Sequence, residues 1–175
     1  MIKGKQSIAF KASPYIEESA SVVGKKEGEG PLGSRFDMVG LDDMFGEDTW
    51  EKAESSMQKE ACQLALGKAH LTAGAIRYLF GGDLLRQGVA TSLGVEQLQI
   101  PMFGLYGACS TSGEALALAS MCVAAGYGER MLVVTSSHFG KCRKGIPFSA
   151  QLCESETAVC TMDGDRKWSI YCWKE

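Results

Sequence analysis

The stretch Gly107-Ala108-Cys109-Ser110-Thr111 decides the fold, because it joins an apolar run at residues 100–106 to an alanine-rich helical pattern at residues 112–125. The apolar run predicts a buried strand, and the junction then places Cys109 at the N-terminus of the following helix. Unpaired backbone N–H groups and the positive end of the helix dipole favour a thiolate at such a place. These residues leave two interpretations of Cys109 open: a reactive thiol, or a buried and inert cysteine that only packs.

Helical and strand patterns alternate on both sides of this junction. Thr49 predicts the N-cap of a helix over residues 50–68, with Glu51 and Glu54 favouring its N-terminal end. Further helices are predicted over residues 84–93 and 110–125, and strands over residues 7–10, 76–80, 100–106 and 130–135. Glycine and proline recur at residues 28–33 and predict an irregular loop over residues 26–33. This order predicts an α/β fold with a mostly parallel sheet and helices on both faces.

Three polar segments follow predicted strands, at residues 81–83, 107–109 and 136–138. Ligands of parallel sheets bind beyond the carboxyl ends of the strands, so we expect a site where these segments converge. The candidate ligand-binding residues are Cys109, Ser110, Thr111 and His138. We expect Asp83 to anchor a loop, because a carboxylate repels an anionic ligand, and His70 to lie at the surface beyond the end of a helix.

The composition excludes several classes of function. The 175 residues carry a net charge of -3 and no basic cluster with interleaved aromatic residues, which argues against nucleic-acid binding. No apolar run of membrane-spanning length and no signal-like N-terminus is present, so we expect a soluble cytoplasmic protein. The seven cysteines form no C-x-x-C pair and only two histidines accompany them, so we expect neither a metal site nor a disulfide framework.

Several separated motifs resemble one known family. They are Gly28-x-Gly30-Pro31-Leu32-Gly33, Trp50-Glu51-x-Ala53-Glu54, Gly82-Asp83-Leu84-Leu85 and Phe103-x-x-x-Gly107-Ala108-Cys109-Ser110-Thr111-Ser112. Residues 1 to about 140 are similar in this way to the stage V sporulation protein AD (SpoVAD) family of the thiolase-like superfamily. The resemblance implies the N-terminal half of a thiolase-like fold, with Cys109 at the position of the acyl-accepting nucleophile.

The resemblance also implies a function. Such a protein binds dipicolinic acid, pyridine-2,6-dicarboxylate, and assists its uptake into the developing spore. It would act at the cytoplasmic face of the forespore inner membrane with other membrane components of the uptake system, as a monomer or a homodimer. No cofactor is implied beyond calcium that accompanies the dipicolinate. The hydroxyls and N–H groups at Ser110 and Thr111, together with His138, offer donors to the two carboxylates.

A thiolate-dependent acyltransferase that uses Cys109 is the alternative. Acyl transfer through a thiolate needs a general base and a stabiliser of the developing charge, usually two histidines or a histidine and an asparagine in this type of fold. A single well-placed histidine, His138, cannot fill both roles. We therefore expect a binding protein rather than an enzyme.

The tail from Lys141 departs from the family pattern. A one-nucleotide shift of the codons for residues 141–149 permits Asn-Ala-Glu-Arg-Ala-Phe-Arg-Phe-Pro, which resembles the expected continuation. We therefore divide the chain into a thiolase-like half domain, residues 1–140, and an aberrant, out-of-frame tail, residues 141–175; a divergent short paralogue is the alternative. Because the ligand site of this fold lies where two similar halves meet, we expect a truncated product to expose apolar surface, to be unstable, and to bind dipicolinate poorly.

Overall fold

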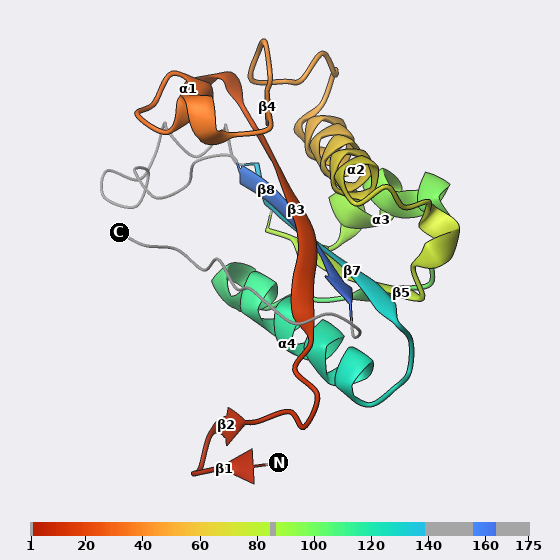
Figure 1. Cartoon of the computed structure of the whole chain (residues 1–175). Helices are drawn as coiled ribbons and strands as arrows, with labels where there is room; N and C mark the ends of the chain where they lie inside the picture. Colours follow the sequence, from red (N-terminus) through yellow and green to blue (C-terminus); the bar gives the residue numbers. More distant parts are fainter. Residues whose placement is uncertain (1, 85–86, 139–155, 164–175) are drawn as a thin grey trace.

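A six-stranded mixed sheet forms the centre of the protein (Figure 1). The structure is a computed structural model that describes residues 2–84, 87–138 and 156–163, the last of these as backbone only. The strands are β3 (Tyr15–Val23), β4 (Met38–Val39), β5 (Tyr78–Asp83), β6 (Met102–Gly104), β7 (Arg130–Ser137) and β8 (Glu156–Asp163), in the order β4-β3-β8-β7-β5-β6. Strands β5, β6 and β7 are mutually parallel, and β8 runs antiparallel to both β3 and β7. A separate hairpin of β1 (Ile2–Lys3) and β2 (Ser7–Ile8) precedes the sheet.

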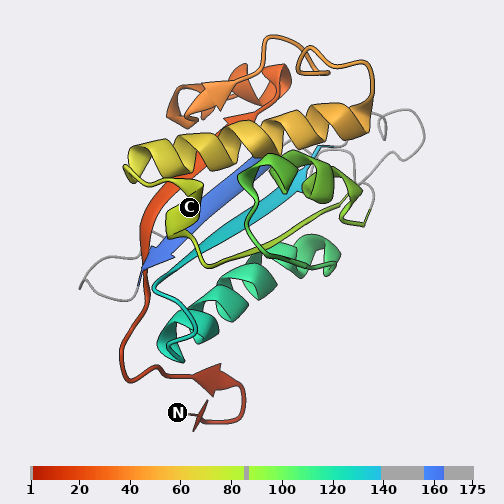
Figure 2. The ribbon, with the colours of Figure 1, turned by 90° about the vertical axis from the view of Figure 1, so that its right-hand side faces the viewer.

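Helices cover both faces of the sheet (Figure 2). Helices α2 (Trp50–Lys68) and α3 (Val89–Val95) lie on one face, and α4 (Thr111–Ala124) lies on the other. The alternation of side chains along β7 shows this division: Leu132 and Val134 pack in the core beneath α2, whereas Met131 and Val133 pack against α4. Even-numbered residues of β7 therefore face α2.

Helix α2 begins where its sequence predicts. The Thr49 hydroxyl accepts a hydrogen bond from the Lys52 N–H at 3.3 Å, which satisfies one of the unpaired donors of the first turn. Met57, Ala61 and Ala65 lie on one stripe of the helix and are fully buried against the sheet. Burial of this stripe, rather than helix propensity alone, fixes the position of α2.

The α/β fold with helices on both faces is as expected, and the helices over residues 50–68 and 110–125 are confirmed to within one residue at either end. The strand predicted over residues 76–80 instead runs from Tyr78 to Asp83, since Gly81 and Gly82 remain in register with β7. The loop expected over residues 26–33 is partly wrong, because one helical turn, α1 (Lys25–Gly28), forms there and ends at the first glycine of the segment. The helix expected from residue 84 begins only at Val89, because Asp83 continues β5 and Gly88 has a φ of 94°, outside the helical region.

The division of the chain at residue 140 remains a prediction. Of residues 141–175, the structure describes only 156–163, which form β8 between β3 and β7. The other residues of the predicted out-of-frame tail lie outside the described part of the chain.

Candidate functional site

Cys109 lies on an exposed turn at the carboxyl edge of the sheet. It belongs to a 3-10 turn, η4 (Ala108–Ser110), which joins β6 to α4, and its side chain is exposed. Ala108, the residue before it, has a φ of 50°, a left-handed conformation that costs a non-glycine residue about 1 kcal/mol or more. Within the described residues Cys109 is therefore not packed in a core. The buried cysteine of the described chain is Cys62, in α2, where desolvation raises the pKa of its thiol to about 12.

Two close contacts hold the turn in place. The Gly107 N–H donates to Thr111 Oγ1 at 3.0 Å, and Thr111 is buried. Before the turn, the Leu105 N–H donates to the carbonyl of Gly81 at 2.8 Å. A Cβ atom on Gly82 would lie 2.1 Å from the Leu105 carbonyl oxygen, so only glycine allows this approach. Thr111 thus positions the turn from beneath; the ligand contact predicted for it is not tested by the structure.

The N-terminus of α4 carries a carboxylate of its own. Ser110 is the N-cap residue but forms no side-chain cap; its hydroxyl lies 2.5 Å from Glu114 Oε1 and 2.8 Å from the Gly107 carbonyl oxygen. Glu114 is in the first turn, where a negative charge interacts favourably with the helix dipole. An anionic ligand at Ser110 would therefore meet a carboxylate, and a divalent cation carried by the ligand would relieve the repulsion.

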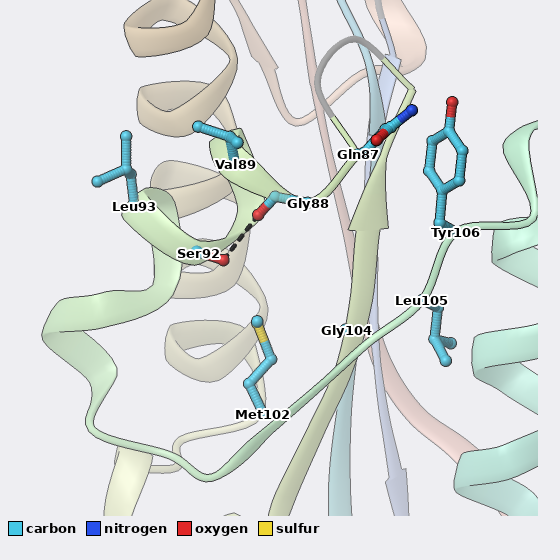
Figure 3. Close-up of a pocket in the computed structure, with 9 residues that line it drawn as sticks. All are labelled: Gln87, Gly88, Val89, Ser92, Leu93, Met102, Gly104, Leu105 and Tyr106. Carbon is cyan, nitrogen blue, oxygen red and sulfur yellow. Dashed lines mark hydrogen bonds between the residues drawn. The ribbon is translucent and has the colours of Figure 1, made fainter.

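An open apolar groove of about 440 Å³ lies between α3 and the segment that leads to Cys109 (Figure 3). Its lining includes Val89 and Leu93 of α3 and Met102, Leu105 and Tyr106 of the β6 segment. Tyr106 is 54% exposed and lies three residues before Cys109. The groove offers apolar walls of the kind that an aromatic ring needs.

His138 lies on the opposite face of the sheet from α4. It comes directly after β7, whose even-numbered residues face α2. Its ring centroid lies 5.2 Å from that of Trp50, at the start of α2. The His138 Nε2–H donates to the carbonyl of Asp43 at 2.7 Å, and only 2% of the residue is exposed. Burial lowers the pKa of His138 below its ordinary value, which favours the neutral ring. The hydrogen bonds of His138 thus join it to the α2 side, and its predicted contact with a ligand beside Cys109 remains a prediction.

Asp83 anchors the start of helix α3, whereas the sequence predicted that it would anchor a loop. Its Oδ2 accepts hydrogen bonds from the Thr91 N–H at 3.0 Å and from the Thr91 hydroxyl at 2.9 Å. Thr91 is in the first turn of α3, so the carboxylate at the end of β5 satisfies donors at the start of that helix. His70, as expected, is exposed in the turn after α2.

Sequence reasoning missed a buried polar cluster beneath α2. Glu54, Gln58 and Ser136 are linked by hydrogen bonds, and Glu54 also accepts the N–H of His138. The spacing of these residues could have indicated the cluster, because Glu54 and Gln58 are four residues apart on the helix and flank Met57 of the buried stripe. The sequence assigned Glu54 only a charge that favours the N-terminal end of the helix, whereas the residue is also fully buried.

Within residues 2–84 and 87–138, no three metal-ligating side chains come together as a metal site. No helix in the same residues has the length and apolar character needed to cross a membrane. In this part of the chain neither histidine hydrogen-bonds to Cys109, so a histidine base for that thiol is not among the contacts described.

Comparison with known proteins places the chain in a family. The family model described as stage V sporulation protein AD (SpoVAD) matches residues 4–165, further than the 140 residues on which the resemblance rested. Stage V sporulation protein AD of Bacillus subtilis (strain 168) is 36% identical over 166 residues, which are 93% of this chain and 49% of that protein. The chain therefore spans about half the length of this curated relative.

Solved structures share the fold. The 3-oxoacyl-[acyl-carrier-protein] synthase III of Aquifex aeolicus VF5 superposes with a TM-score of 0.63 at 16% identity, covering 88% of this chain and 55% of that one. The priming β-ketosynthase of the R1128 polyketide biosynthetic pathway gives a TM-score of 0.61 at 14% identity, covering 93% of this chain and 53% of that one. These values confirm the predicted thiolase-like fold and the correspondence to about half of it.

Proposed function

The chain belongs to the stage V sporulation protein AD family, and from that premise we propose that it binds dipicolinic acid and assists its uptake into the developing spore. The observation that supports the proposal most directly is the exposed turn at Cys109, which opens α4 beside an apolar groove. Helix N-terminal donors and apolar walls are what a rigid aromatic dicarboxylate requires.

The Glu114 carboxylate at this turn favours the calcium chelate over the free dianion. Calcium dipicolinate is neutral, so the chelate brings a cation toward Glu114 while its carboxylates approach the positive N-terminal end of α4. We therefore expect calcium to enter with the ligand rather than to reside in the protein. Removal of calcium should weaken binding, and Glu114→Gln should abolish the preference for the chelate.

We place the complete ligand site where two similar halves of the fold meet, and the 175 residues span about half the length of the curated relative, so we expect these residues on their own to bind weakly. Helix α4 is consistent with this arrangement. It carries a single charged residue, Glu114, and Leu118 and Met121 on its outer side are exposed at 36% and 38%. A helix that is apolar around its circumference is normally covered on both sides.

Isothermal titration of monodisperse protein with calcium dipicolinate tests the proposal. Isophthalate is the control ligand, because it keeps the two carboxylates at the same spacing but lacks the ring nitrogen that completes the calcium chelate. We expect weak binding of dipicolinate, less of isophthalate, and a loss in Ser110→Ala that the exposed Ser34→Ala does not show. Binding that is equal for both ligands and insensitive to Ser110→Ala would contradict the proposal.

A thiolate acyltransferase is the second candidate, supported by the exposed Cys109 and by the likeness of the fold to ketosynthases. Incubation with an acyl thioester, followed by peptide mass spectrometry, separates the two functions. Transfer of the acyl group to Cys109 Sγ with release of the free thiol supports the enzyme. No transfer, together with protection of Cys109 by dipicolinate, supports binding.

We also propose that the protein acts peripherally at the cytoplasmic face of the forespore inner membrane, with membrane components of the same uptake system. A homodimer would form through the edge strand β6, where Phe103 is 49% exposed. Sedimentation velocity of the parent chain and of Phe103→Glu tests the dimer. A monomeric parent chain at all accessible concentrations would contradict it.

A further inference from the structure

One amide links two buried carboxyl groups beneath α2. Gln58 Nε2 donates one hydrogen bond to Thr91 Oγ1 at 3.1 Å and another to Ser136 Oγ at 2.5 Å. Each of these hydroxyl oxygens already accepts from the amide, so each hydroxyl proton points onward to a carboxylate. Thr91 donates to Asp83 at 2.9 Å, and Ser136 donates to Glu54 at 2.6 Å. The direction of every hydrogen bond between Asp83 and Glu54 in this series is thereby fixed.

The cluster lacks hydrogen-bond donors. Three buried atoms have no hydrogen-bond partner in the described part of the chain: Glu54 Oε2, Gln58 Oε1 and His138 Nδ1. A carbonyl can only accept, so the contact of His138 with the Asp43 carbonyl places the ring proton on Nε2 and leaves a lone pair on Nδ1. All three atoms are therefore acceptors when Glu54 is ionised. Buried acceptors without donors are costly, and a single added proton would turn one of them into a donor.

The charges around Glu54 are negative. Asp83 of β5 and Glu51 of α2 both disfavour its ionised form, and α3 carries no ionisable side chain. His138 contacts Glu54 through its backbone N–H, and the described contacts of Glu54 include no lysine or arginine. Glu54 is fully buried, and burial is the main cause that raises its pKa to about 7.

We propose that this cluster is a proton-binding site: Glu54 takes one proton from solvent onto Oε2, the oxygen that neither Ser136 nor His138 contacts, and so changes from a carboxylate to a neutral acid. The neutral acid keeps its other oxygen, Oε1, as the acceptor for Ser136 and for the His138 N–H. Loss of the proton leaves two negative groups, Glu54 and Asp83, in one buried network. The end of β7 is then held less firmly against α2.

The proposal gives a signed dependence on pH. In the unfolded chain the pKa of Glu54 is near its ordinary value of 4.5, and in the folded chain it is about 7, so the folded state holds more protons between these values. The stabilisation of the folded state by protonation of Glu54 is fully present below pH 4.5 and is lost as the pH rises through 7. The folding equilibrium constant should fall on the order of 100-fold between pH 5 and pH 8 through this group.

The test combines a direct titration with a matched pair of variants. Carbon-13 NMR of the glutamate carboxyls in the unmodified chain should show one that titrates near neutral pH and is absent in Glu54→Gln. Denaturant unfolding from pH 5 to pH 8 should show the loss of stability in the parent and in Glu60→Gln, a partly exposed residue of the same helix, but not in Glu54→Gln, whose amide mimics the protonated acid. The proposal would be overturned if no glutamate carboxyl titrated near neutral pH, so that Glu54 titrated near pH 4.5 with the others. Equal pH dependence of the unfolding free energy in all three proteins would also overturn it. The NMR titration decides the matter even where Glu54→Gln does not fold.

Discussion

Replacement of Gly82 by alanine should displace the turn that carries Cys109. The added Cβ would lie 2.1 Å from the Leu105 carbonyl oxygen and 3.0 Å from Thr111 Cγ2, and the first of these is backbone that cannot rotate away. Carbon and oxygen atoms normally approach to about 3.3 Å, so β5 and the segment before Cys109 must separate by roughly 1 Å. Overpacking of this kind costs about 2–3 kcal/mol.

Gly113→Ala is the matched control. Gly113 lies in the first turn of α4, and a Cβ there would meet nothing within 4 Å. Alanine in a helix is favoured over glycine, so this variant should gain about 0.5–1 kcal/mol. Urea unfolding followed by circular dichroism measures both changes, and the rate of iodoacetamide labelling at Cys109, located by peptide mass spectrometry, reports the turn. Gly82→Ala with the stability and labelling rate of the parent would refute the reasoning.

Three further predictions concern the same turn and the helix opposite. Thr111→Val should cost about 1–2 kcal/mol in urea unfolding, because the Gly107 N–H loses its buried acceptor, whereas Thr111→Ser should retain most of the stability. Ala108→Gly should stabilise the chain by up to about 1 kcal/mol by relieving the positive φ, and an unchanged midpoint would contradict this. Thr49→Ala should lower thermal stability by about 1 kcal/mol through loss of the α2 cap, and Thr49→Ser should not.

Local signals predicted the helices well, and tertiary pairing decided the rest. Thr49 and the buried stripe of α2 fix that helix from its own residues. Strand β3 was missed, because residues 15–23 include Glu17, Glu18 and Ser19 and show no clear alternation of apolar side chains. Its partner β8 lies more than 130 residues later, and the pairing register of the two strands shifts between Ile16 and Glu18. The periodicity of a local stretch of sequence does not predict pairing with so distant a strand.

The candidate site was predicted in part. The position of the Cys109 junction followed from the strand-to-helix order, because a short connection at the end of a parallel strand must lie at the carboxyl edge, but its exposure did not. The sequence did not show, however, on which face of the sheet the polar residues at that edge lie. The parity of β7, with Leu132 and Val134 beneath α2, assigns Ser136 and His138 to the side away from α4. Glu54 was missed because burial of a carboxyl requires partners that only the folded chain supplies.

The out-of-frame origin of residues 141–175 stays a prediction that resequencing of the gene decides. A nucleotide missing or added near codon 140, with a family-like continuation in the shifted frame, would support it. An uninterrupted frame without such a continuation would refute it. The match of the family model as far as residue 165 and the placement of residues 156–163 in β8 are the observations that any account of the tail must include.

Protection of Cys109 tests the central claim, that the turn before α4 is a ligand site. The measurement is the iodoacetamide labelling rate of Cys109 with increasing calcium dipicolinate, with half-buried Cys122 of α4 as the internal reference. We predict a saturable decrease at Cys109, no change at Cys122, and little protection by isophthalate. A labelling rate at Cys109 that does not respond to dipicolinate at any concentration would contradict the claim.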